Sequence, residues 1–279
     1  MIERTISGAE APLPPHPDIP APPSIGFNGL HSTLRAFSDQ DWRVPMVFAD
    51  VETTGLSPDC DRIVEIGGVR YDENGEYAGS FHCYTDPGVP IPDEAAAVHG
   101  ITDARMREML DSGQAVPLSR EVMRAFSRFC NNAVFVAHNG TVFDRIFIDR
   151  ECRRHRIPTI TDRAGGLDTL HIARMRWPGS RVSLDDLCSK TGIDKSARAN
   201  AHGALLDSVL LASIFPRMMA CEDRTLLSHV IGVDDVSEIV SVTGRLGELR
   251  SPDRLLWAAT PEEIARSGSI DQEVCAKWK

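Results

Sequence analysis

The sequence predicts an α/β fold in which a mixed β-sheet carries helices on both faces. Two observations support this fold class: three short apolar runs follow one another closely, and apolar runs then alternate with helical patterns. Strands joined by tight turns pair antiparallel, whereas strands separated by a helix generally pair parallel. The order therefore predicts a folded body over residues 45–217.

Each expected element has its own local signal. The first three strands are expected at residues 46–54, 62–72 and 76–86, with a tight Glu73-Asn74-Gly75 turn before the third. A fourth strand is the apolar run at 133–140, which ends at Asn-Gly. Apolar residues at helical spacing predict helices at about 118–129, 143–155, 183–191 and 203–219.

The two ends of the chain differ from this body. Residues 1–44 hold a crowd of prolines and no apolar periodicity, which predicts a flexible, disordered tail. Residues 218–279 contain short polar and apolar segments, with helix-start signals at Ser251-Pro252 and Thr260-Pro261. These signals predict a small helical C-terminal extension.

The composition excludes several classes of protein. The 279 residues carry 30 Lys and Arg against 40 Asp and Glu, a formal net charge of −10. That charge argues against a nucleic-acid packaging protein, but not against an enzyme that acts on nucleic acid. There is no apolar stretch of membrane-spanning length and no secretory signal, so we expect a cytoplasmic protein. The seven cysteines form no CxxC pair and indicate reduced thiols.

Two acids end the first expected strand. Asp50 and Glu52 are two residues apart, so their side chains project from the same face, about 7 Å apart along the backbone. The strand around them is apolar, where an unpaired charge is costly, and a bound divalent cation would offset that cost. The alternative is a strand that runs out into a turn and ends in solvated acids.

Two further segments place polar groups at helix starts. Asp144 follows the break at Asn-Gly and falls in a first helical turn. The alternative is a purely structural role, because an acid near a helix start interacts favourably with the helix dipole. His202 and Asp207 are five residues apart, about 500° on a helix, so they would not share a helical face. We therefore expect His202 on the loop before the helix and Asp207 on the helix, although such a histidine is often only a surface or capping residue.

The joint occurrence of these groups suits phosphodiester hydrolysis with two metal ions. Hard carboxylate oxygens favour Mg²⁺ or Mn²⁺ over Zn²⁺, and two ions about 3.5 to 4 Å apart stabilise both the attacking and the leaving oxygen. A histidine with an ordinary pKa near 6.5 can accept the proton of the attacking water.

Six segments in order resemble the motifs of the DEDDh group of 3′-to-5′ exonucleases, most closely the epsilon branch that proofreads for bacterial replicative DNA polymerases. They are FADVETTGL, IVEIGGV, VHGIT, AHNGTVFD, SLDDLC and HGALLDSVLLA. The resemblance implies a ribonuclease H-like mixed five-stranded sheet and an exonuclease domain over residues 45–217.

The resemblance also implies a role for each acid. Asp50 would bridge the two metal ions, Glu52 and Asp207 would complete the site of the ion that carries the attacking water, and Asp144 would support the second ion. His202 would be the general base. The implied contacts to the terminal 3′ nucleotide are Thr53, Thr54, Leu56, His99, Asn139 and Phe143, of which several could equally be packing residues.

The function expected from the resemblance is removal of nucleotides from the 3′ end of DNA, single-stranded or frayed, in proofreading or repair. An exoribonuclease that trims RNA, and a non-catalytic binding or scaffolding module, are the alternatives. A DNA polymerase partner is conceivable, but none of Gln40, Gln114 and Gln272 leads a recognisable clamp-binding segment. A basic cluster at 150–156 could guide phosphates, although a solvated helix face is the favoured alternative.

Overall fold

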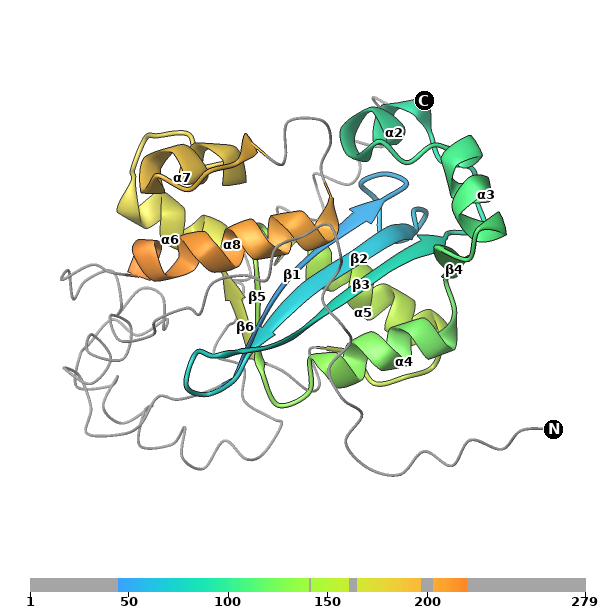
Figure 1. Ribbon diagram of the computed structural model, residues 1–279, viewed down its shortest axis with the longest axis horizontal. Coiled ribbons are helices and arrows are strands. Elements are labelled where there is room, and N and C mark those ends of the chain that lie inside the picture. Colours follow the sequence, from blue (N-terminus) through green and yellow to red (C-terminus); the bar gives the residue numbers. More distant parts are fainter. Residues whose placement is uncertain (1–44, 141, 161–164, 197–202, 220–279) are drawn as a thin grey trace.

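The computed structural model describes residues 45–140, 142–160, 165–196 and 203–219. Three sequence-based expectations therefore fall outside the described residues: the Pro-rich tail, the C-terminal extension and the placement of His202. The described residues contain a six-stranded sheet with helices on both faces (Figure 1), which confirms the predicted α/β class.

The strand order is β4-β3-β2-β1-β5-β6, and the sheet is mixed. β1 pairs antiparallel with β2 and β2 with β3, whereas the pairs β1–β5, β5–β6 and β3–β4 are parallel. The strands are β1 (Met46–Thr53), β2 (Ile63–Tyr71), β3 (Tyr77–Asp86), β4 (Ala115–Pro117), β5 (Val134–Ala137) and β6 (Gly165–Asp168).

The sequence pattern located four of these six strands, and the five strands that the resemblance implies are one too few. β4 has only three residues at the edge beside β3, and two of them are exposed, so no apolar alternation marks it in the sequence. β6 is equally hard to read, because two of its four residues are glycines.

Four helices fall where apolar periodicity predicts them: α4, α5, α7 and α8. Ser183 and Asp186 form a reciprocal capping box at the start of α7. Within the described residues, no helix combines the length and the apolar character needed to cross a membrane. The helices are α2 (Asp93–His99), α3 (Asp103–Asp111), α4 (Arg120–Phe129), α5 (Asp144–Arg154), α6 (Thr169–Arg176), α7 (Leu184–Thr191) and α8 (Ala204–Met219).

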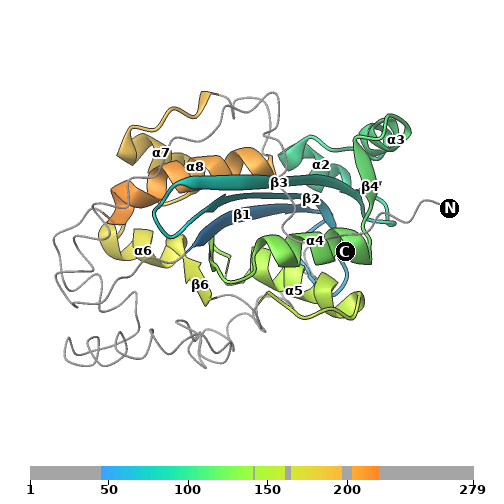
Figure 2. The same cartoon turned by 60° about the horizontal axis from the view of Figure 1, so that its bottom comes forward.

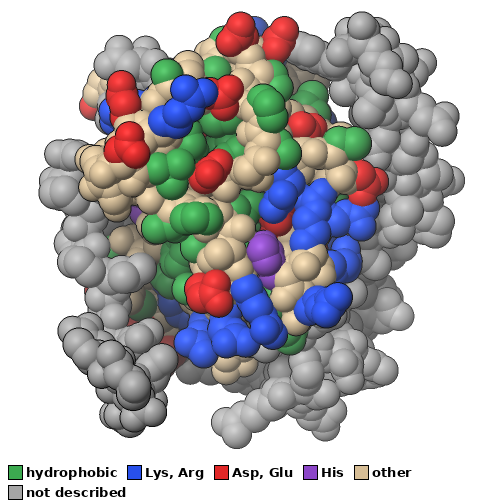
Figure 3. All heavy atoms as spheres, turned by 90° about the vertical axis from the view of Figure 1, so that its right-hand side faces the viewer, with side chains coloured by type: hydrophobic (Ala, Val, Ile, Leu, Met, Phe, Trp, Pro, Cys, Tyr) green, Lys and Arg blue, Asp and Glu red, His purple; other side chains and the backbone are tan. Residues whose placement is uncertain are grey.

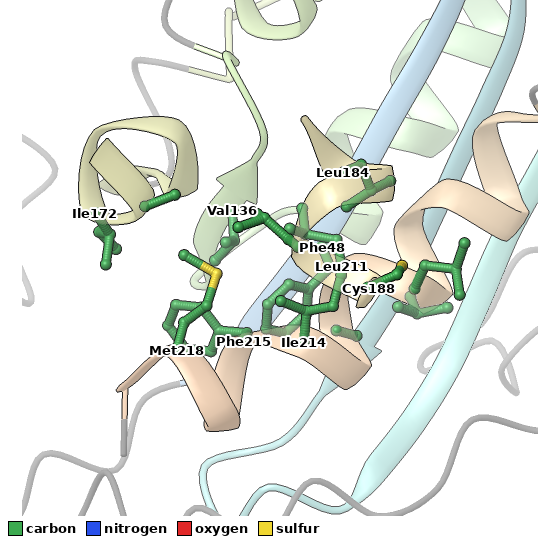
Figure 4. Packing of buried hydrophobic residues seen from close by; sticks show 14 of the residues in the cluster. Phe48, Val136, Ile172, Leu184, Cys188, Leu211, Ile214, Phe215 and Met218 are labelled. Carbon is green, nitrogen blue, oxygen red and sulfur yellow. The ribbon is translucent and has the colours of Figure 1, made fainter. Parts of the chain in front are cut away.

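Side chains of β1 point alternately to the two faces of the sheet and contribute to two separate hydrophobic cores. Phe48 points to the face covered by α6, α7 and α8, where it packs against Phe215 with ring centroids 5.3 Å apart (Figure 4). Val47 and Val51 point to the opposite face, which α4 and α5 cover (Figure 2). Asp50 and Glu52 have the parity of Phe48, so their side chains leave the strand on the face where α8 lies.

A glycine lets α8 approach the sheet closely. A Cβ atom on Gly67 of β2 would lie 2.2 Å from the main-chain carbon of Ala204, the first residue of α8. Only a residue without a side chain fits under that helix. Because Gly67 is the cross-strand neighbour of Asp50, this contact brings the start of α8 to the acids of β1.

Candidate active site

Three carboxylates converge at the carboxyl end of β1. Asp50 and Glu52 come from β1, and Asp207 comes from the first turn of α8. One carboxylate oxygen from each of the three lies within 4.8 Å of the other two. Asp207 is 4% exposed and Glu52 is 9% exposed, so the cluster lies in a largely desolvated region at the carboxyl end of β1.

The fourth acid reaches the same end of β1 from α5. Asp144 is the first residue of α5, is 2% exposed, and accepts a hydrogen bond of 3.0 Å from the backbone N–H of Val51. β5 runs parallel to β1, so the segment that leaves β5 emerges beside the end of β1. The left-handed backbone of Asn139, with φ of 68°, turns the chain there towards α5.

Crowding and burial shift the protonation of this group. Burial is the largest cause that raises the pKa of Asp50 well above its ordinary value of 3.8, and the neighbouring carboxylates raise it further. In decreasing order of effect, those carboxylates belong to Asp144, Glu52, Asp207 and Glu65. Burial also raises the pKa of Asp144 to about 7, against the opposing effect of the hydrogen bond from Val51.

The donor set fits a divalent cation. Converging carboxylates are the hard oxygen ligands that Mg²⁺ and Mn²⁺ prefer, and a cation would offset the repulsion that raises the pKa of Asp50. Within the described part of the chain, Asp50, Glu52 and Asp207 are the residues placed to hold such an ion, with Asp144 behind them at Val51.

Three expected substrate contacts follow Glu52 directly in the chain. The Thr53 hydroxyl donates to the carbonyl of Gly55 at 2.5 Å, and the Thr54 hydroxyl donates to Asp61 at 3.0 Å. Both threonines are buried and shape the turn after β1, whereas Leu56 in the same turn is 57% exposed. Leu56 is therefore the one of the three whose side chain is open to contact by a ligand.

The other three expected contacts come from two separate segments. His99 is the last residue of α2, is buried, and accepts a hydrogen bond from the backbone N–H of Ile101. Asn139 and Phe143 flank the turn into α5, and the backbone N–H of Asn139 donates to Asp168 at 2.9 Å. The half-buried Phe143 ring packs on Phe147.

Sequence reasoning missed two residues beside the acids. Glu65 of β2 is 2% exposed and is the cross-strand neighbour of Glu52, and His82 of β3 lies 2.8 Å from its carboxylate. The available signal was a charged residue within the apolar strand segment IVEIGGV. An acid at a buried strand position needs a partner, and Glu65 projects from the same face of the sheet as Glu52.

The basic cluster of α5 has a structural role in part. Arg154 donates to the carbonyls of Pro58 and Asp59 in the loop between β1 and β2, and Arg150 pairs with Asp59. Figure 3 shows that Lys and Arg side chains gather in the lower half of the face where α4 and α5 lie in Figure 1. The cluster therefore anchors that loop through Arg150 and Arg154, while Arg153 and Arg156 are exposed to solvent.

Comparison with known proteins identifies the family. The sequence profile of the exonuclease family RNase_T matches residues 47–215, which include all four acids and His202. The chain belongs to this exonuclease family. It is accordingly a 3′-to-5′ exonuclease of the DEDDh type, most similar to the epsilon branch.

Two relatives and one solved structure illustrate the similarity. DNA polymerase III subunit epsilon of Pasteurella multocida is 35% identical over 178 residues, which cover 62% of this chain and 67% of the relative. The same subunit of Rickettsia typhi is 31% identical over 225 residues, 79% of this chain and 92% of the relative. The fold also resembles Escherichia coli Exonuclease I in complex with a dT13 oligonucleotide, with TM-score 0.53 and 18% identity, over 62% of this chain and 40% of that one.

The raised pKa of Asp144 predicts a pH-dependent stability of the metal-free protein. Between the unfolded pKa near 3.9 and the folded pKa of about 7, the unfolded chain loses a proton that the folded chain keeps. The free energy of unfolding should therefore fall as pH rises through this window. In EDTA at pH 8, Asp144→Asn should be more stable than the wild type by up to about 4 kcal/mol, measured by urea unfolding.

Asp93→Asn is the matched control, because Asp93 is the first residue of α2 but is exposed. It should leave the pH profile of the wild type unchanged. If Asp144→Asn has the same profile as the wild type, or is less stable at pH 8, burial does not hold this acid protonated.

Proposed function

We propose that the protein hydrolyses DNA from its 3′ end by a metal-dependent mechanism. The observation that carries the proposal is the convergence of Asp50, Glu52 and Asp207 at the end of β1, with Asp144 bonded to the intervening Val51. DNA as the substrate is supported by the relatives, which are subunits of a DNA polymerase.

The chain's own residues would bind and orient the reacting groups. Asp50, Glu52, Asp207 and Asp144 would hold two Mg²⁺ or Mn²⁺ ions, which supply a nucleophile at neutral pH and stabilise the charge of the attacking and leaving oxygens. Leu56 is exposed in the turn that follows β1 and would contact the terminal nucleotide. Thr53 and Thr54 would hold this turn in place through their hydrogen bonds.

His202 is the proposed general base. It directly precedes Gly203, which accepts a hydrogen bond from the Asp207 N–H at 2.9 Å, so by sequence it belongs to the segment that leads into α8. An imidazole with an ordinary pKa near 6.5 can take a proton from water at neutral pH.

A DNA polymerase is the partner that the relatives suggest, and this also stays a proposal. The basic surface of α4 and α5 would attract the phosphates of a nucleic-acid strand. We propose a cytoplasmic location, in keeping with the sequence.

The direct test of the substrate is digestion of 5′-labelled single-stranded DNA and RNA of one sequence, with Mg²⁺, Mn²⁺ or EDTA. We expect stepwise shortening from the 3′ end that requires metal and is faster on DNA. Asp50→Ala and Asp207→Ala should abolish it while the fold remains at least as stable as the wild type in EDTA, because each removes crowded charge.

Faster digestion of RNA than of DNA would assign the protein to RNA trimming. A folded wild type that shortens neither strand under any condition would favour a non-catalytic binding module. Unfolding of the two alanine variants would mean that these acids are structural.

His202→Ala should lower kcat by about 10² to 10⁴ while Mn²⁺ binding is largely retained, since a base contributes to proton transfer and not to metal affinity. Single-turnover kinetics together with calorimetric Mn²⁺ titration measures both quantities. A variant with the wild-type rate would show that another group accepts the proton.

A further inference from the structure

A largely buried pair of residues lies on the same face of the sheet as Asp50 and Glu52. His82 Nε2 lies 2.8 Å from Glu65 Oε1, and the two side chains are 14% and 3% exposed. Neither residue has a part in the chemistry proposed above. Because an unpaired buried carboxylate is costly, His82 is what makes Glu65 tolerable at this position.

The strand register places the pair next to the site. Gly67 of β2 has Asp50 as its neighbour on β1 and His82 as its neighbour on β3. One row further along the sheet, Glu65 lies directly across from Glu52. Like charges directly across a strand pair are destabilising, so the bond to His82 on β3 holds the Glu65 carboxylate against that repulsion.

The same pair borders the start of α8. The backbone of Ala204 lies over Gly67, in the row between Asp50 and His82. Glu65 Oε1 lies 3.9 Å from where a Cβ atom on Gly203 would be. The N–H groups at a helix N-terminus carry partial positive charge, so a carboxylate beside them favours the helix staying there.

We propose that the Glu65–His82 pair positions the first turn of α8, and with it Asp207, against Asp50 and Glu52. The pair acts through α8 and does not itself bind the metal. The inference rests on the proposed function, because it adds a supporting layer to the proposed metal site. Such supporting partners commonly change metal affinity by about 10- to 100-fold when they are removed.

Calorimetric titration with Mn²⁺, without nucleic acid, tests this role apart from catalysis. His82→Ala should weaken Mn²⁺ affinity by about 10- to 100-fold, and kcat on single-stranded DNA should fall while KM for DNA stays near that of the wild type. His82→Gln should restore most of the affinity, because its amide N–H can still donate to Glu65.

His155→Ala is the matched control. His155, the residue that follows α5, is also partly buried, with Nε2 3.8 Å from the buried Glu151 of α5. This pair lies away from the start of α8, and Glu151 keeps Arg62 and Arg154 as partners. It should leave Mn²⁺ affinity unchanged. Wild-type affinity in His82→Ala, or equal weakening in His155→Ala, would overturn the proposal.

His82→Asn serves as a second variant if His82→Ala does not fold. Its shorter amide cannot reach Glu65 as the glutamine does, so it should bind Mn²⁺ more weakly than His82→Gln, and equal affinities would contradict positioning by His82. A wild type that binds no Mn²⁺ contradicts the proposed function itself. A wild type that binds Mn²⁺ with the same affinity as a folded His82→Ala contradicts only the positioning role.

Discussion

Repulsion among carboxylates that share one desolvated region at the carboxyl end of β1 is the constraint on which this site depends. Asp50, Glu52 and Asp207 have oxygens within 4.8 Å of one another, and burial together with that crowding raises the pKa of Asp50. A protein gains no stability from such an arrangement by itself. The surrounding elements therefore have to hold the acids together until a cation offsets their charge.

Several independent features of the fold supply that restraint. β1 lies between β2 and β5, so acids on it lie next to groups from the strands that flank β1 on either side. Gly67 lets the start of α8 lie directly on β2. Nearer the carboxyl end of α8, Phe215 packs against Phe48 of β1 and holds the helix on the sheet (Figure 4). The bond from Val51 N–H fixes Asp144 at the start of α5. Each acid thus sits on a rigid element and not on a free loop.

Much of this arrangement could be predicted from the sequence, because the signals are local. Alternation along 46–54 placed Asp50 and Glu52 on one face, and the break at Asn139 placed Asp144 in a first helical turn. Periodicity found the long amphipathic α8. The short β4 and the glycine-rich β6 carry no such pattern, so the strand count was underestimated. Glu65 and His82 escaped notice because their pairing depends on strand register, which links residues 17 positions apart.

The most direct test of the central claim is the stabilisation of the fold by metal at pH 8. If the acids are held for a cation, Mn²⁺ should raise the melting temperature of the wild type as its concentration increases, by mass action equivalent to about 2.7 kcal/mol at 100 times Kd. Asp50→Asn should already be more stable in EDTA and should gain much less from Mn²⁺. A wild type whose melting temperature does not respond to Mn²⁺, or a variant that responds equally, would contradict the account.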